Sequence, residues 1–304
     1  MDAIYRDSEG ETLTKQQVHA LPADQLQERS GLRVNILGSH ERLYDAIAEV
    51  MLQTAIAAQG QKVTMILPVG PTGQYPLFVE KVKQQKVDCR NLWTINMDEF
   101  LDRTGRTIPE SHPMSFKGIM MKLFYEALPE DLRMPREQMF FPRHDNLDDI
   151  DRAFDEHAPE GVDLCLAGVG PEGHFAFNED PNFAHVRVSE SEFLADRTRL
   201  VTVKASTVDM DSLVASSGDR SAVPPFAVTI GPHDILRAKN INVIFFAGPF
   251  QRYALREVLF REPTMHFPGT LLKLAVDGDG NVTRRDLTVW TTPVEAAPVT
   301  SQTI

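Results

Sequence analysis

One short stretch of this sequence concentrates groups that can move protons. Residues 168–179 run GVGPEGHFAFNE, so His174 stands between Glu172 and Glu179 and follows three glycines. An imidazole that is hydrogen-bonded to a carboxylate is held in one tautomer and becomes more basic. A single histidine is most often structural, but glycines let a ligand approach the backbone closely. The segment therefore favours a proton-transfer site built on Glu172, His174 and Glu179.

A second candidate is the pair of acids Asp98 and Glu99, which follows an apolar run in the stretch Asn96-Met97-Asp98-Glu99-Phe100. A carboxylate at the end of a strand can act as a general base if its pKa suits the task. Alternatively, one of these acids caps the turn that follows. The pattern alone leaves both roles open.

A third candidate is the loop Gly70-Pro71-Thr72-Gly73, which lies between an expected strand and an expected helix. Such a loop presents backbone N–H groups and a helix N-terminus to an anion. Thr72 adds a hydroxyl donor. A plain strand-to-helix turn is the alternative, and for this loop taken alone it is the favoured interpretation.

Alternating strands and helices must position these three segments. We expect strands at Val34–Leu37, Val63–Leu67, Leu92–Met97, Val162–Ala167, Arg199–Val203, Ala227–Ile230 and Ile241–Ala247, and two more around the turn 277–280. We expect helices after Ser39 to Ala58, after Gly73 to Gln85, and over Met114–Leu128, Pro232–Ala238 and Gln251–Phe260. Near-continuous apolar strands that alternate with helices predict a parallel sheet covered on both faces. Ligands of such sheets bind beyond the carboxyl ends of the strands, where all three candidate segments lie.

The whole-chain properties narrow the class of protein. The chain has 304 residues, of which 42% are hydrophobic and 24% charged, and its net charge is −12. This acidity argues against duplex nucleic acid as a partner. Two separated cysteines, Cys89 and Cys165, suffice neither for a disulfide framework nor for a cysteine metal site. With no signal peptide and no membrane-length apolar run visible, we expect a cytoplasmic protein without a membrane partner.

The domain prediction is one α/β domain over residues 34–291. Residues 1–33 are polar and predict an N-terminal extension with a short helix, and residues 292–304 predict a loose C-terminal tail. Residues 168–173 also match the pattern G-x-G-x-x-G, but Pro171 lies inside the loop and no amphipathic helix follows. Metal-binding spacings are absent as well. We therefore expect neither an organic cofactor nor a metal.

Three motifs, taken in order and spacing, resemble those of the glucosamine-6-phosphate deaminase/isomerases. They are Asn96-Met97-Asp98-Glu99-Phe100, His112-Pro113-Met114-Ser115-Phe116 and the segment 168–179. The resemblance extends from about Val34 to Val289. The loop Leu67–Gly73 is placed where the family has its phosphate-facing glycine loop, so the resemblance implies that Gly70, Pro71, Thr72 and Gly73 bind the phosphate group. It implies a Rossmann-like three-layer α/β sandwich with a mostly parallel central sheet and a mobile lid near Pro181–Arg199.

The resemblance also implies a mechanism. His174, tuned by Glu172 and Glu179, opens the ring of a hexosamine phosphate. Asp98 then carries a proton between C2 and C1 through an enediol-type intermediate, and ammonia leaves. The implied partner is a small-molecule sugar phosphate, no cofactor or metal is needed, and a homo-oligomer is left open.

The departures from the family pattern concern the anion site above all. Glu172 stands where the family usually has Asp, and Pro71 and Gly73 replace the usual glycine and proline. Residues 206–215 contain no Arg or Lys, although the family has an arginine there. A family lysine appears as Gln251, so we expect the adjacent Arg252 to contact the phosphate, with Lys204 and Arg220 as further candidates. The alternatives are a lactonase of the 6-phosphogluconolactonase type and a sugar-phosphate-binding module without turnover; Asp98 favours the isomerase.

Overall fold

The core of the protein is a seven-stranded parallel sheet. The computed structural model describes residues 3–57, 61–181, 187–277, 279–285 and 287–300. The strand order is β3-β14-β11-β8-β4-β5-β7, and every neighbouring pair is parallel. The strands are β3 Arg33–Ile36, β14 Thr288–Thr291, β11 Ile241–Ile244, β8 Leu164–Gly168, β4 Val63–Leu67, β5 Leu92–Asn96 and β7 Met139–Phe140. The predicted mostly parallel sheet is confirmed.

Apolar side chains on both faces of the strands bury this sheet between two helical layers. In β8, Leu164 and Leu166 pack into one core cluster, whereas Cys165 and Ala167 pack into the other. This alternation follows from the two-residue period of a strand. It makes the protein an α/β three-layer sandwich, as predicted.

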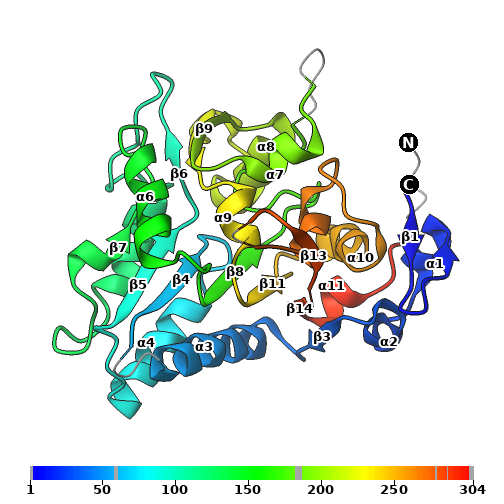
Figure 1. The fold of residues 1–304 in the computed structure, drawn as a ribbon, viewed down its shortest axis with the longest axis horizontal. Coiled ribbons are helices and arrows are strands. Elements are labelled where there is room, and N and C mark those ends of the chain that lie inside the picture. Colours follow the sequence, from blue (N-terminus) through cyan, green and yellow to red (C-terminus); the bar gives the residue numbers. More distant parts are fainter. Residues whose placement is uncertain (1–2, 58–60, 182–186, 278, 286, 301–304) are drawn as a thin grey trace.

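Each helical layer joins one of the two clusters. The first contains α3 His40–Ala57, α4 Gln74–Gln85, α5 Phe116–Met120 and the π-helical turn Met121–Tyr125. The second contains α6 Leu147–His157, α9 Pro232–Leu236 and α10 Arg252–Phe260. Figure 1 shows α3 and α4, in blue and cyan, together along one side of the sheet. No helix among the described residues is long and apolar enough to cross a membrane.

Four of the expected strands lie outside the parallel sheet. The strands β6 Asp98–Leu101, β10 Phe226–Thr229 and β9 Arg199–Thr202 form a separate antiparallel sheet in the order β6-β10-β9. The chain passes from β5 into β6 with only Met97 between them. This junction turns the backbone out of the central sheet, and β10 holds Asp98 opposite Thr229. The strands around the turn 277–280 form the hairpin β12 Leu274–Val276 and β13 Val282–Arg284.

Both chain ends pack more closely than the predicted domain boundaries imply. The extension holds strands β1 Tyr5–Arg6 and β2 Thr12–Leu13 and helices α1 Lys15–Ala20 and α2 Leu26–Ser30. The Tyr5 hydroxyl donates to Glu257 on α10 at 2.7 Å. The expectation of a loose tail from residue 292 is wrong at its start, because α11 Pro293–Ala296 is ordered and buries Glu295 completely. Figure 1 shows the N-terminal segment and α11 on the same side of the molecule as α10.

Two short helices occupy the region of the predicted lid and the chain after it. The lid segment Pro181–Arg199 contains α7 Glu190–Ala195, which packs against α9, and residues 182–186 lie outside the described part of the chain. The next helix is α8 Ala205–Ala215. Because α8 contributes side chains to a cavity at the sheet edge, it bears directly on the site.

Candidate active site

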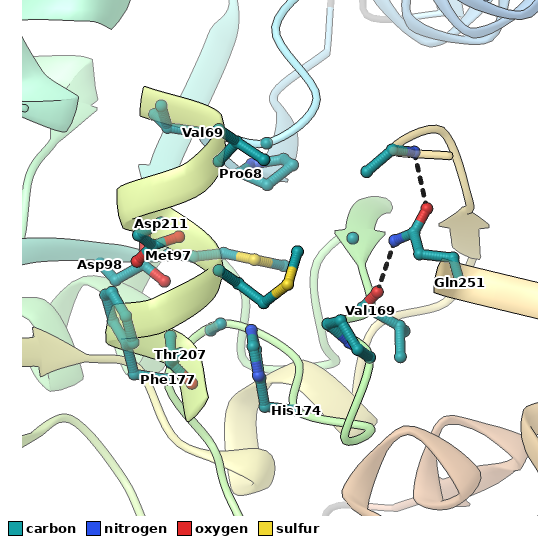
Figure 2. Close-up of a pocket in the computed structure, with 18 of the residues that line it drawn as sticks. Pro68, Val69, Met97, Asp98, Val169, His174, Phe177, Thr207, Asp211 and Gln251 are labelled. Atoms are coloured by element: carbon teal, nitrogen blue, oxygen red, sulfur yellow. Dashed lines mark hydrogen bonds between the residues drawn. The ribbon is translucent and has the colours of Figure 1, made fainter. Parts of the chain in front are cut away.

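A cavity of about 260 Å³ lies where four strands of the central sheet end. Its walls come from the loops after β4, β5, β8 and β11 and from α8. Figure 2 shows Asp98 and Asp211 on one side of this cavity, His174 at its base and Gln251 on the opposite side. Asp98 and His174 are 76 positions apart in sequence (174 − 98). The fold nevertheless brings both side chains to the same cavity.

Glycines after β8 make room for the His174 ring. The turn is closed by the Gly170 N–H, which donates to the His174 carbonyl at 2.9 Å, and by the Gly173 N–H, which donates to the Gly170 carbonyl at 3.0 Å. A methyl group added at Gly170 would lie 2.1 Å from Cε1 of the imidazole. One added at Gly168 would lie 2.4 Å from the carbonyl oxygen of Gly70. These glycines therefore serve close approach of a side chain and of a neighbouring loop.

Glu172 and Glu179 surround His174, as predicted. The Nδ1 atom of His174 lies 3.5 Å from Oε2 of Glu172, which is an ion-pair contact longer than a well-formed hydrogen bond. Burial by itself lowers the pKa of His174, but the nearby Glu172 outweighs it and the net pKa is raised. Burial likewise opposes ionisation of Glu172, yet the imidazole lowers the pKa of that carboxyl to about 2. The pair therefore favours the imidazolium–carboxylate form.

Thr207 on α8 links the two glutamates. Its hydroxyl contacts Oε1 of Glu172 at 3.1 Å and also makes a short contact with Oε1 of Glu179. Burial raises the pKa of Glu179, although Thr207 and His174 oppose the shift. Since a hydroxyl has one proton but can also accept, a proton on Glu179 can be donated to Thr207 while Thr207 donates to Glu172. The three side chains form a short proton-holding chain beside His174.

The structure separates the roles of Asp98 and Glu99. Four donors saturate the buried Glu99 carboxylate: the N–H groups of Phe100, Phe116 and Lys117 and the Ser115 hydroxyl, at 2.8 to 3.0 Å. Glu99 therefore caps the N-terminus of α5. Asp98 faces the cavity and is 8% exposed. Burial, followed by the negative charge of Glu99, raises the pKa of Asp98 well above its ordinary value, which brings it toward the range useful to a general acid or base.

Asp211 is a cavity residue that the sequence analysis missed. It lines the cavity with Thr207, Met210 and Val214, which share one face of α8 at helical spacing. Burial raises the pKa of Asp211 to about 6, although His174 opposes the shift. In the sequence, residues 206–215 are notable only because they lack the family's arginine. The spacing of positions 207, 210, 211 and 214 is the pattern that would have indicated this face.

Most of the predicted phosphate ligands lie away from the cavity. Gly70 lines the cavity and is joined to Pro71 by a cis peptide bond. Pro71, Thr72 and Gly73 do not line the cavity. The space beside Gly73 is filled by the ring of Tyr44. Arg252 is directed elsewhere, since its Nε donates to the Val294 carbonyl at 2.8 Å. Among the described residues, the structure thus brings only Gly70 of the predicted anion site to the candidate centre.

Gln251, at the position of the family lysine, does line the cavity. Its Oε1 accepts from the N–H groups of Phe246 and Ala247 at 2.8 and 2.7 Å, and its Nε2 donates to the Val169 carbonyl at 2.8 Å. Figure 2 shows this amide between its partners. A lysine has no acceptor and could not make the first two bonds. Gln251 therefore ties the loop after β11 to the loop after β8.

One group of side chains could also accommodate a cation. Donor atoms of Glu172, His174 and Glu179 all lie within 4.8 Å of one another. Two carboxylates and an imidazole are a donor set that divalent metals accept. The same three groups are arranged for proton transfer, and Thr207 already contacts both carboxylates. The geometry thus does not require a metal to explain the cluster.

Two proteins that align with this chain are both described as glucosamine-6-phosphate deaminases. No family model matches the chain. A glucosamine-6-phosphate deaminase from Phocaeicola vulgatus is 31% identical over 176 residues, which are 57% of this chain and 60% of that protein, so the chain spans less than two thirds of that relative. A glucosamine-6-phosphate deaminase from Thermoanaerobacter pseudethanolicus is 24% identical over 250 residues, or 81% of this chain and 90% of that protein.

Solved structures agree with these relatives. A monomeric glucosamine-6-phosphate deaminase superposes with a TM-score of 0.69 at 21% identity, over 87% of this chain and 98% of the other. The 6-phosphogluconolactonase from Thermotoga maritima superposes with a TM-score of 0.56 at 16% identity, over 86% of this chain and 98% of the other. At these identities the structural likeness establishes a common fold. Together with the aligned relatives, it makes the chain similar to the glucosamine-6-phosphate deaminases in sequence, and to both these enzymes and the 6-phosphogluconolactonases in fold.

Proposed function

We propose that this protein is an enzyme that isomerises and deaminates an amino-sugar phosphate of the glucosamine-6-phosphate type. The observation that carries the proposal is the shared cavity of Asp98 and His174. A carboxyl group with a raised pKa and an imidazole held by carboxylates are the two groups that such a proton-transfer reaction requires. The names of the aligned relatives support the same substrate class.

The first step assigned to the site is ring opening by His174. The imidazolium donates a proton to the ring oxygen, and the resulting imidazole takes the proton of the anomeric hydroxyl, which yields the open-chain aldehyde. The Glu172 carboxylate, 3.5 Å from Nδ1, stabilises the imidazolium at the start and at the end of this step. Thr207 and Glu179 hold Glu172 from behind, so they act as positioning residues.

The second step is proton transfer by Asp98. Its carboxylate removes the proton from C2, which carries the amine, and the protonated carboxyl returns a proton to C1. Over the same step O1 gains a proton and the nitrogen on C2 loses one, so that C1 is reduced from the aldehyde to the alcohol and C2 is oxidised to an imine. Water adds to the imine, ammonia leaves, and a ketose phosphate remains. No external oxidant or reductant is needed, because the two carbons exchange oxidation states.

The test is a panel of amino-sugar and neutral sugar phosphates assayed for both ammonia and ketose. We expect equal amounts of the two products from an amino-sugar phosphate. The family's fold is shared with lactonases, so 6-phosphogluconolactone belongs in the panel. Acid release from the lactone without ammonia release from any amino sugar would overturn the proposal in favour of the lactonase.

A further inference from the structure

The charged groups of the cavity are arranged unlike those of an anion site. The ionisable side chains that line it are Asp98, His174 and Asp211, with Glu172 and Glu179 next to the imidazole. Neither Arg nor Lys occurs among the described residues that line it. A dianionic phosphate inside this cavity would therefore lack the cationic partners that usually bind it.

Two basic side chains next to the His174 loop, Lys204 and Arg199, contact residues of that loop. Lys204 Nζ donates to the Asp180 carbonyl at 2.6 Å, and Arg199 Nη1 donates to the Asn178 amide oxygen at 2.9 Å. Gln251 has both ends of its amide occupied by backbone groups. Where the family pattern has two cations, this chain thus presents an uncharged amide, held by backbone groups at both ends, and the acidic α8.

The mouth of the cavity is apolar. Val214 and Phe250 line it and remain 63% and 40% exposed. Val214 lies one turn beyond Asp211 on α8. Such side chains can pack against an uncharged part of a ligand, but they offer nothing to a phosphate group. The charge-recognising part of the cavity is consequently its acidic inner wall.

Asp211 is suited to receive a cation on that wall. Unlike Glu99, its carboxylate has no hydrogen bond or ion pair with any residue in the described part of the chain. Figure 2 shows it on the same side of the cavity as Asp98. Because the substrate's amine is bonded to C2, whose proton Asp98 would remove, a sugar placed for that step carries its ammonium group toward this wall.

We propose that the site recognises its substrate through the protonated amine, which Asp211 binds, and that a phosphate group contributes little to affinity. The proposal rests on the proposed function, since Asp98 defines the position of C2. Asp211 is thus a specificity-determining residue. It follows that amino sugars with and without a phosphate bind with similar affinity, and that neutral sugar phosphates bind poorly.

The test is calorimetric binding of glucosamine, glucosamine 6-phosphate and glucose 6-phosphate to the full chain. We expect the two amino sugars to bind within about tenfold of one another, and glucose 6-phosphate to bind about 10- to 100-fold more weakly than glucosamine 6-phosphate, the effect of losing one charge-assisted hydrogen bond. The Asp211→Asn variant should lose a similar factor for both amino sugars and nothing for glucose 6-phosphate.

The matched control is Asp209→Asn. Asp209 lies on the same helix, but its carboxylate pairs with Arg220 at 2.5 Å and lies outside the cavity lining. This variant should bind both amino sugars like the unmodified protein. A thermal melt of each variant checks that the fold is retained.

The outcomes separate the two proposals. Binding of glucosamine 6-phosphate more than about 100-fold tighter than glucosamine would overturn recognition through the amine, because a cationic phosphate site produces such a factor. Unchanged affinity of Asp211→Asn would overturn it as well. Amine-dependent binding without ammonia or ketose formation would support the recognition proposal while ending the proposed reaction.

Discussion

Replacing Gly170 by alanine adds one methyl group where the structure has no room for it. That methyl carbon would lie 2.1 Å from Cε1, 2.5 Å from Nδ1 and 2.6 Å from Nε2 of the His174 ring. Ordinary contacts between such atoms begin near 3.4 Å, so the ring must move by about 1 Å (3.4 − 2.1 = 1.3 Å at the closest atom). A displacement of that size at a reacting group can reduce a rate by about 10²-fold.

The assay is steady-state ammonia release by the Gly170→Ala variant. We expect kcat/KM to fall by about 10²-fold, while the melting temperature stays close to that of the unmodified protein, because a side chain rather than the backbone gives way. Gly38→Ala is the matched control, since the added methyl meets only Arg42 Nη1, at 3.8 Å. If Gly170→Ala kept more than half of the activity, the placement of His174 in the reaction would be refuted.

Three further predictions concern the same cavity. Asp98→Asn should reduce turnover by about 10²- to 10⁴-fold, as expected on removing a general base. The variant should unfold at no lower urea concentration than the unmodified protein at pH 7, because it replaces a buried carboxyl whose ionisation is disfavoured. Near-normal turnover would show that Asp98 is not the base. Glu172→Gln should lower the pKa of His174 in an NMR titration and move the limb of the pH–rate profile that this imidazole controls to lower pH, because Glu172 is what raises that pKa. The pKa of Glu172, about 2, lies below its ordinary value of 4.5, so the ionised Glu172 stabilises the fold above pH 4.5 and this stabilisation is lost as the pH falls toward 2. The difference in unfolding free energy between the unmodified protein and Glu172→Gln should therefore shrink over that pH range. A difference that does not shrink would contradict the pairing of Glu172 with His174. Gln251→Leu leaves two backbone N–H groups and a carbonyl without their partner and should lower the free energy of unfolding by about 1–3 kcal/mol in urea titrations, whereas Gln53→Leu, on the exposed side of α3, should change it by less than about 0.5 kcal/mol.

Much of the central sheet could be predicted because its signals are local. Apolar runs such as Val63–Leu67 and Ile241–Ala247 predict strands buried on both faces, and the structure has them at β4 and β11. The helix expected after Ser39 is α3, and the Ser39 hydroxyl accepts from the Arg42 N–H at its start. The antiparallel pairing of β9 and β10 could not be predicted, because partner and direction depend on contacts between residues far apart in the chain.

The cluster around His174 could also be predicted, because its residues are close together in the sequence. Glu172 and Glu179 lie within a few residues of the imidazole, so a single loop brings the three together. The expectation for Arg252 had no comparable basis. It rested on sequence adjacency to Gln251, and successive residues of a helix point in different directions. Gln251 therefore faces the cavity, while Arg252 bonds to Val294.

The sequence by itself determined the alternation of strands and helices, the sheet edge at which the candidate site lies, and the local set of acids around His174. Only the tertiary structure decided that the Glu99 carboxylate caps a helix while Asp98 lines the cavity, and that α8 places Asp211 on the wall of the cavity. The physical reason is that hydrogen-bond saturation and burial depend on which distant segments meet. Those contacts, and not residue type, determine which carboxylates remain available to a substrate.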